Sequence, residues 1–222
     1  MMKVIDLIVG ARPNFMKVAP IIRALSSRKN GALSYRLIHT GQHYDPRLSD
    51  TFFEQLKIPR PNENLNAGSG TQAEQTASIM TKYEALLLDG RKSSACLVVG
   101  DVNSTMACAI SAQKLGVPVA HVEAGIRSGD WTMPEEINRL VTDSITDWFF
   151  TTSESANENL RRSGVDDSRI FFVGNTMIDT LLANFEDLKE PSLFSSLGLQ
   201  SNSYFVATLH RPANVDGEFN FY

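Results

Sequence analysis

The sequence predicts a doubly wound α/β fold (Rossmann-like), in which helices cover both faces of a parallel β-sheet. Short segments rich in Val, Ile, Leu and Phe alternate along the chain with longer amphipathic segments. Most of the short segments are nearly continuous apolar runs, which is typical of strands that are buried on both faces. Regular alternation of strand and helix favours right-handed crossovers between parallel neighbours. With 222 residues the chain is long enough for a substantial core.

The elements can be placed in order along the chain. Strands are predicted over residues 3–10, 35–41, 95–101, 118–124, 147–153, 170–174 and 204–210. Helices are predicted over residues 14–28, 72–88, 103–115, 135–146, 154–163 and 176–188. Asn103, Ser153 and Asn175 offer capping oxygens at three of the helix starts. Prolines, asparagines and glycines within residues 45–69 indicate a long loop.

We expect the chain to divide into two parts. Residues 1–189 hold six of the seven predicted strands and form one Rossmann-like catalytic domain. Residues 190–222 contain a connector with Pro and Ser, followed by a strand without a sheet of its own. They are expected to be a linker and the first strand of a truncated second domain. Because an unpaired strand exposes its hydrogen-bonding groups, the 204–210 segment is expected to be disordered, packed on a neighbour or exchanged between chains.

Composition argues against several function classes. A formal net charge of -4 without long basic runs gives no general attraction to nucleic acid or anionic membranes. No stretch approaches the roughly 20 apolar residues of a membrane helix, so a cytoplasmic protein without a membrane partner is expected. Cys96 and Cys108 lack metal-ligand spacing and are predicted to be buried, reduced thiols. GxGxxG and GxxxxGK[ST] motifs are missing, so neither a dinucleotide cofactor site nor a P-loop is expected, and without GxSxG no nucleophile elbow is expected.

Polar or small residues stand at the carboxyl ends of six predicted strands, where ligands bind in open parallel sheets. They are Gly10, Arg12, Pro13, Thr40, Gly41, Gln42, His43, Gly100, Asp101, Asn103, Ser104, His121, Glu123, Gly125, Arg127, Gly174, Asn175, His210 and Arg211. Neighbouring carboxylates disfavour each other's ionised form, so at least one carboxyl group is expected to have a raised pKa that suits proton transfer. Arginine and lysine side chains nearby suit an anionic substrate.

Each of these residues also has a structural interpretation. Gly10 and Gly100 would relieve crowding at tight strand–helix turns. Asp101 could cap the helix that follows it. His121 lies within a strand and would face neighbouring packing rather than a ligand. The pair Glu135–Glu136 follows a proline and fits the first turn of a helix, where acids interact favourably with the helix dipole.

Six segments in a fixed order make the chain recognisable. They are GARPNFMKVAP (10–20), TGQHYD (40–45), GDVNST (100–105), HVEAGIRSGDWTMPEEINR (121–139), VGNTMID (173–179) and TLHRPANVD (208–216). Together they resemble the non-hydrolysing UDP-N-acetylglucosamine 2-epimerases over nearly the whole chain. The resemblance implies the N-terminal domain of a glycosyltransferase-B type fold and a homodimer. It also implies interconversion of UDP-GlcNAc and UDP-ManNAc in cell-surface polysaccharide biosynthesis, through UDP elimination to 2-acetamidoglucal and re-addition, without a cofactor or metal.

The resemblance also assigns roles to residues. Those implied to be catalytic are Asp101, Glu123, Glu135 and His210. Those implied to bind substrate are Arg12, Lys17, Arg139 and Arg211. Gln42 and His43 match a region where some bacterial members bind a second UDP-GlcNAc as an activator. Which carboxylate removes the C2 proton and which returns it stays open.

Two departures from the family pattern leave alternatives open. Pro212 and Ala213 precede Asn214 where members often have Glu before Asn, so a sister activity on a UDP-2,3-diacetamido sugar uronic acid is an alternative. A hydrolysing relative that releases ManNAc and UDP is another. Complete members are about twice this long, and their second half carries most of the uridine contacts. The chain alone is therefore expected to bind weakly and to be largely inactive, a silent folded module.

Overall fold

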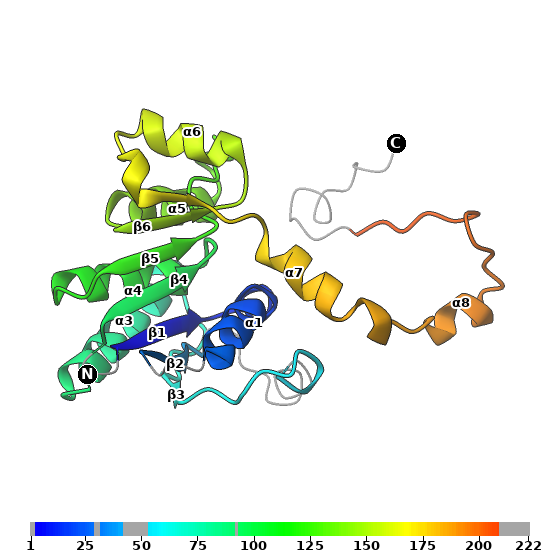
Figure 1. The fold of residues 1–222 in the computed structure, drawn as a ribbon, viewed down its shortest axis with the longest axis horizontal. Helices are drawn as coiled ribbons and strands as arrows, with labels where there is room; N and C mark the ends of the chain where they lie inside the picture. Colours follow the sequence, from blue (N-terminus) through cyan, green and yellow to red (C-terminus); the bar gives the residue numbers. More distant parts are fainter. Residues whose placement is uncertain (1–2, 29–31, 42–52, 92, 209–222) are drawn as a thin grey trace. The chain divides into compact units, whose positions relative to one another are not determined.

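The computed structural model describes residues 3–28, 32–41, 53–91 and 93–208. The chain divides into two compact units, Met1–Asn184 and Phe185–Tyr222, each of which is described by itself. The first unit contains a seven-stranded, wholly parallel sheet with the strand order β3-β2-β1-β4-β5-β6-β7 (Figure 1). The predicted doubly wound α/β fold is thereby confirmed.

The bounds of the elements are as follows. The strands are β1 Lys3–Val9, β2 Leu33–His39, β3 Glu63–Asn64, β4 Ala95–Val99, β5 Val119–Val122, β6 Trp148–Thr151 and β7 Ile170–Phe172. The helices of the first unit are α1 Arg12–Ser27, α3 Gln72–Leu88, α4 Asn103–Lys114, α5 Pro134–Ser144, α6 Glu154–Arg162 and α7 Thr176–Ala183, with a short 3₁₀ helix at Asp167–Arg169. The second unit holds α8 Ser192–Ser196 and a 3₁₀ turn at Phe185–Asp187. Within the described ranges, no helix combines the length and the apolar character needed to cross a membrane.

The order of the strands fixes where a ligand crevice can form. From β1 the chain first winds outward through β2 and β3, and then it returns to β4 on the other side of β1. The register pairs Asp6 of β1 with Arg36 of β2 and with Cys96 of β4. In sheets of this kind the crevice opens at the carboxyl ends of the two strands where the winding reverses. Here those strands are β1 and β4.

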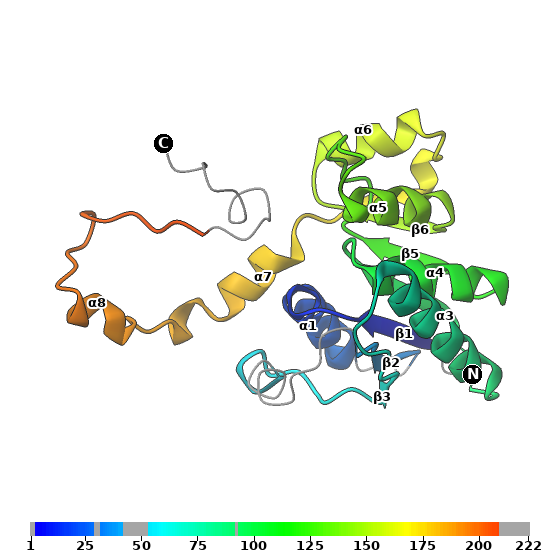
Figure 2. The ribbon, with the colours of Figure 1, turned by 180° about the vertical axis from the view of Figure 1, so that it is seen from behind.

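The two faces of the sheet are covered by different helices. Leu7 and Val9 of β1 pack with Phe15 of α1, whereas Ile8 between them packs on the opposite face with Ile79 of α3. This alternation is the expected consequence of successive side chains pointing to opposite faces of a strand. Helices α3 and α4 lie behind the sheet in Figure 1 and in front of it in Figure 2. Both faces of the central strands are therefore dry, which explains their continuous apolar sequence.

Several local predictions were correct and others were wrong. The strands expected up to residue 174 are present with shifted ends. Strand β3 and helical residues 53–55 occur within the segment predicted as a long loop. Helix α8 lies in the segment predicted as a connector. The described part of the 204–210 segment, residues 204–208, forms no strand. A strand needs a hydrogen-bonded neighbour, and the described residues of the second unit contain none.

The capping predictions had mixed outcomes. The side chains of Ser153 and Asn175 accept hydrogen bonds from backbone N–H groups, as expected for N-caps. The prediction for Asn103 was wrong because the N-cap of α4 is Val102. The Asn103 amide instead donates to the side-chain oxygens of Gln72 and Gln75 in α3, at 2.6 and 2.8 Å. A tertiary partner has therefore replaced the local cap.

Cys96 and Cys108 are free, buried thiols, as predicted. Cys96 of β4 and Cys108 of α4 belong to the same apolar cluster between the sheet and the helices α3 and α4. Burial raises the pKa of each thiol above its ordinary value. Since the thiolate is the reactive form, these two cysteines are structural side chains.

A buried ion pair ties β1 and β2 to α3. Asp6 has no exposed surface, and Arg36 donates to both of its carboxylate oxygens at 2.8 Å. The Tyr83 hydroxyl donates to the same carboxylate at 2.9 Å, and burial raises the pKa of Tyr83. A carboxylate without contact to water requires such partners, because an unpaired buried charge is strongly destabilising.

We predict that Arg36→Met lowers the free energy of unfolding by about 3–5 kcal/mol, because Asp6 would stay buried without its cation. Urea unfolding at pH 7 measures this loss. Arg91→Met is the matched control: Arg91 pairs with Glu63 and Asp89 but is exposed, so its removal should leave the unfolding midpoint near that of the wild type. An equal loss of unfolding free energy in the two variants would show that the buried Asp6 pair contributes no more to stability than the exposed pair.

Candidate active site at the carboxyl edge of the sheet

The segments that follow β1, β4 and β5 meet at one place, which we call the carboxyl edge (residues 10–17, 100–103 and 123–143). Gly100 has a φ of +70°, and a Cβ there would lie 3.0 Å from Lys17 Nζ and 3.6 Å from Glu123 Oε2. A Cβ on Gly10 would lie 2.1 Å from the Ser104 hydroxyl oxygen. Both glycines therefore relieve crowding at strand–helix turns, as one interpretation of the sequence proposed.

Lys17 and Glu123 form an ion pair across this edge. Lys17 Nζ lies 2.5 Å from Glu123 Oε2, and the two side chains are 13% and 11% exposed. Glu123 has a φ of +69°, a left-handed conformation that costs a non-glycine residue roughly 1–3 kcal/mol. Its backbone N–H donates to the Phe150 carbonyl of β6 at 3.0 Å. The surrounding sheet thus holds a strained residue that directs a carboxylate toward Lys17.

Arg139 joins two other carboxylates. Its Nη2 lies 2.5 Å from Asp101 Oδ2, and its Nη1 donates to Glu136 Oε2 at 2.8 Å. Burial lowers the pKa of Arg139, but hydrogen bonds to Glu136 and the charge of Asp101 outweigh it and raise that pKa. One arginine of α5 therefore holds the carboxylate that directly follows Gly100.

Glu136 fixes the loop that precedes α5. Its carboxylate accepts hydrogen bonds from the backbone N–H groups of Ser128 and Gly129, at 2.9 and 3.1 Å, and from the Ser128 hydroxyl. Burial acts to raise the pKa of Glu136, but the Ser128 backbone, Arg139 and the other donors together lower it to about 2. Glu136 is therefore a permanent anion that anchors its own loop.

Asp143, His121 and Arg127 form a third charged group. Asp143 Oδ1 lies 2.7 Å from His121 Nδ1, and Oδ2 accepts from Arg127 Nη1 at 2.6 Å and from the Gly125 N–H at 3.0 Å. His121 Nε2 lies 2.8 Å from the Gly100 carbonyl oxygen. Burial acts to raise the pKa of Asp143, but hydrogen bonding and charge from His121 and Arg127 outweigh burial and lower it. The interpretation of His121 as a packed strand residue is confirmed, since its side chain is buried.

Five of the charged residues singled out in the sequence lie in the described part of this edge in ion pairs: Lys17, Asp101, Glu123, Arg127 and Arg139. Glu135 is half-buried in the first turn of α5, where acids were expected, and its carboxylate has no hydrogen bond or ion pair within the described residues. Arg12 begins α1, but its side chain is outside what the structure describes. Gln42, His43, His210 and Arg211 also lie outside the described residues.

The structure bears on two expectations about the acids. The pKa shifts resolved for carboxyl groups at this edge, those of Glu136 and Asp143, are downward and not upward. The reason is that Arg139 lies beside Glu136 and Arg127 beside Asp143, and a nearby cation favours the ionised form. Asp101 does not cap α4, because Val102 occupies the N-cap and the Asp101 carboxylate contacts Arg139 instead.

Three residues that hold this edge together were not assigned a role at the site from the sequence. Asn14 accepts from the N–H groups of Gly10 and Ala11 and donates to the Val99 carbonyl, which closes the turn after β1. Glu136 and Asp143 are the others. A signal for them exists, because Glu136, Arg139 and Asp143 follow the helical spacing i, i+3, i+7. The buried positions of α5 are all polar, namely Glu136, Asn138, Thr142 and Asp143.

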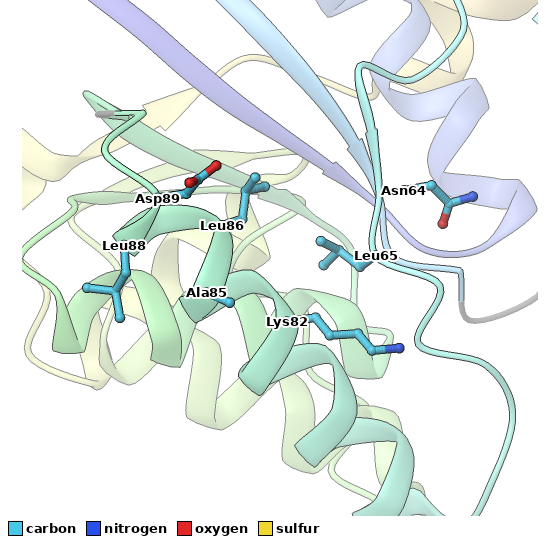
Figure 3. A pocket seen from close by; sticks show the side chains of 7 residues that line it. All are labelled: Asn64, Leu65, Lys82, Ala85, Leu86, Leu88 and Asp89. Atoms are coloured by element: carbon cyan, nitrogen blue, oxygen red, sulfur yellow. The ribbon is translucent and has the colours of Figure 1, made fainter.

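A hollow beside α3 is not part of this site. It is lined by Asn64, Leu65, Lys82, Ala85, Leu86, Leu88 and Asp89 (Figure 3). Lys82 reaches from α3 to the carbonyl oxygen of Asn66, at 2.5 Å. None of the charged residues of the carboxyl edge lines this hollow. Within the described ranges, no group of three or more His, Cys, Asp and Glu side chains could hold a metal ion.

We predict that Glu136 makes stability depend on acid pH. Its pKa is about 2 in the folded chain and 4.5 ordinarily, so its stabilising contribution is complete above pH 4.5 and is lost as the pH falls toward 2. That contribution is about 3 kcal/mol by linkage. Urea unfolding from pH 7 to pH 2.5 should show a shallower acid slope for Glu136→Gln than for the wild type. Glu84→Gln, at an exposed position of α3, should keep the wild-type slope; a wild-type slope in Glu136→Gln would contradict the prediction.

Comparison with known proteins places this arrangement in a family. The family model described as UDP-N-acetylglucosamine 2-epimerase matches residues 25–221. A UDP-N-acetylglucosamine 2-epimerase of Methanocaldococcus jannaschii is 43% identical over 218 residues, which cover 96% of this chain and 58% of that protein. A UDP-2,3-diacetamido-2,3-dideoxy-D-glucuronate 2-epimerase of Pseudomonas aeruginosa is 41% identical over 212 residues, which cover 94% of this chain and 58% of that protein.

A solved structure also shows similarity to the UDP-N-acetylglucosamine 2-epimerases. The crystal structure of the M. jannaschii UDP-GlcNAc 2-epimerase in complex with UDP-GlcNAc and UDP superimposes with a TM-score of 0.85 and 43% identity, over 96% of this chain and 58% of that one. The chain thus spans somewhat more than half the length of the relatives it matches. With the family model covering most of its residues, the chain belongs to the UDP-N-acetylglucosamine 2-epimerase family.

Proposed function

We propose that this chain supplies the catalytic carboxylates of an epimerase that interconverts UDP-GlcNAc and UDP-ManNAc. The observation that carries the proposal is the placement of Asp101 and Glu123 around Gly100, with Asp101 paired to Arg139 and Glu123 to Lys17. They lie where the winding of the sheet reverses, the usual ligand crevice of this fold. The M. jannaschii relative bears the name of this activity, and its solved complex contains UDP-GlcNAc and UDP.

The proposed reaction needs two proton-transferring groups and no oxidation or reduction. A carboxylate takes the proton from C2 of the sugar, the C1–O bond breaks, and its electron pair leaves with UDP. The electrons of the C2–H bond form the C1–C2 double bond of 2-acetamidoglucal. In the return step a UDP oxygen attacks C1, and a second acid delivers a proton to C2 from the opposite face. Asp101 and Glu123 are the described candidates for these two roles, together with Glu135.

Cations at the same edge suit the leaving group. Negative charge develops on the diphosphate as the C1–O bond breaks, and fixed positive groups stabilise such charge in a site shielded from water. Lys17 and Arg139 are the described cations of this kind, each 13% exposed. From the family motifs, His210 remains a proposed catalytic residue and Arg12 and Arg211 remain proposed substrate contacts. Gln42 and His43 remain the proposed activator region.

A second substrate is a specific alternative. The P. aeruginosa relative, named for a UDP-2,3-diacetamido sugar uronic acid, is 41% identical, against 43% for the M. jannaschii relative. The proposed steps at C1 and C2 apply equally to both sugars. Both UDP-sugars should therefore be tested in the same assay. The one that is epimerised at the higher rate is the substrate.

We also propose a cytoplasmic homodimer that acts in cell-surface polysaccharide biosynthesis, with residues 1–189 as the catalytic domain and residues 190–222 leading into a second one. These proposals rest on the resemblance to the family and on the fact that the proposed reaction uses a nucleotide sugar as its substrate. Light scattering of the purified chain tests the dimer. A mass near twice 24.5 kDa would support it, and a mass near 24.5 kDa would count against it.

Activity is best tested by deuterium incorporation at C2. Proton NMR with UDP-GlcNAc in D₂O is run on the 222-residue chain and on a chimera in which it replaces the corresponding 58% of the M. jannaschii relative. We expect the chimera to lose the C2 proton signal and to form UDP-ManNAc, and the chain alone to be much slower. Free ManNAc and UDP as products would instead indicate the hydrolysing activity. A folded chimera that gives neither exchange nor products would contradict the proposal.

We predict that Asp101→Asn and Glu123→Gln each slow C2 exchange by the chimera by about 10²–10⁴-fold, the usual contribution of a proton-transferring group. Asp89→Asn is the matched control, since Asp89 also pairs with an arginine but lies at the end of α3, outside the carboxyl edge. Its exchange rate should equal that of the unmodified chimera. Wild-type rates in Asp101→Asn and Glu123→Gln would remove these residues from the mechanism.

A further inference from the structure

The contacts of His121 determine how many protons its ring carries. The side chain is buried in β5, and each ring nitrogen faces one oxygen: Asp143 Oδ1 at 2.7 Å from Nδ1, and the Gly100 carbonyl at 2.8 Å from Nε2. A carbonyl oxygen can only accept a hydrogen bond. A carboxylate also can only accept. Both ring nitrogens therefore face acceptors.

Neither neutral tautomer satisfies this geometry. With the proton on Nδ1, the lone pair of Nε2 would point at the Gly100 carbonyl oxygen. With the proton on Nε2, the lone pair of Nδ1 would point at Asp143. Transfer of a proton to Asp143 is opposed by its other partners, the Arg127 guanidinium and the Gly125 N–H, which favour the carboxylate. The lowered pKa of Asp143 agrees with this.

We propose that His121 is an imidazolium at neutral pH, clamped between Asp143 and the Gly100 carbonyl, and that it acts as a positioning residue for both carboxylates of the site. The charge of the ring is inferred from its two hydrogen-bond partners and does not depend on the proposed reaction. The positioning role rests on the proposed function of Asp101 and Glu123.

The charge balance of the edge supports a cationic ring. The ion pairs of the described carboxyl edge join three basic side chains to four carboxylates: Lys17, Arg127 and Arg139 to Asp101, Glu123, Glu136 and Asp143. With a neutral His121 these seven largely buried side chains carry a net charge of 3 - 4 = -1. A doubly protonated ring brings it to 4 - 4 = 0. Since unbalanced charge is costly away from water, the balanced state is favoured.

The imidazolium fixes two backbone segments at once. Through Nε2 it holds the Gly100 carbonyl, which directly precedes Asp101. Through Asp143 it is joined to the Gly125 N–H, two residues after Glu123. Glu123 lies in a left-handed conformation that persists only where its surroundings hold it. The ring thus sets the positions from which both carboxylates extend.

A second buried histidine provides an internal control. His39 of β2 is also fully buried, but its Nδ1 accepts the backbone N–H of Gly41 at 3.0 Å. An accepting nitrogen carries no proton, so His39 is the neutral Nε2–H tautomer. Burial lowers the pKa of His39, which agrees with that state. Under this proposal the molecule contains two buried histidines in different charge states, a cationic His121 and a neutral His39.

The test is nitrogen NMR of the 222-residue chain labelled with ¹⁵N-histidine, between pH 6.5 and 8.5. We expect two protonated ring nitrogens for His121 throughout this range, and one protonated and one unprotonated nitrogen for His39. His121→Gln and His39→Gln assign the two sets of signals. A neutral His121 ring at pH 7 overturns the proposal. This readout needs no substrate, so it can succeed or fail independently of the proposed epimerase activity.

Variants then test the positioning role. In Asp143→Asn the ring should become neutral by pH 7.5, and exchange of the Gly125 amide hydrogen should accelerate at least tenfold. The amide signals of Asp101 and Glu123 should shift in Asp143→Asn and in His121→Gln. Ser144→Ala, the next residue of α5 with an exposed hydroxyl bonded only to the Val141 carbonyl, should change none of these. A ring that stays cationic in Asp143→Asn, or unshifted Asp101 and Glu123 amides, would overturn the role given to this pair.

Discussion

The carboxyl edge depends on one constraint, which is that a carboxylate taken out of water needs a cation or several N–H donors. Glu136 and Asp143 are almost fully buried, at 2% and 6% exposure. Burial alone would favour protonation of such groups. The fold prevents this by bringing positive side chains from separate segments, Arg139 from α5 and Arg127 from the loop before it. The charged site can therefore form only when these segments are packed together.

This constraint changes the chemistry expected of the site. A cluster of acids by itself suggests a carboxyl group that keeps its proton near neutral pH. Asp101 and Glu123 instead stand beside Arg139 and Lys17 as ion pairs. A carboxylate in that state is prepared to accept a proton, the first step of the proposed reaction. Under the proposed function, the diphosphate of the substrate is a second anion for the same cations, so binding of substrate and the state of the carboxylates are coupled.

The sequence predicted those features that arise from local pattern. Strands β4 and β5 were found because strands buried on both faces are continuously apolar. Strand β3 was missed because Glu63 and Asn64 have no strand pattern, and their two-residue pairing with β2 is a tertiary effect. The cap at Asn103 failed for the same reason, since α3 supplied a better partner. The left-handed Glu123 could not be predicted either, because only the packed sheet holds it there.

The candidate site shows the same division between what touches a ligand and what supports it. The motif that carried the resemblance ends at Arg139, and it contains Glu123 but not Asp143, one helical turn further along α5. Yet Asp143 joins His121, Gly125 and Arg127, which surround Glu123 in the chain. The residues proposed to contact substrate fall within recognisable strings, whereas the support from Asp143 lies beyond the string and is visible only as its helical spacing from Glu136 and Arg139. A chain could therefore keep every motif of this family and still misplace its carboxylates through one change in the buried face of α5.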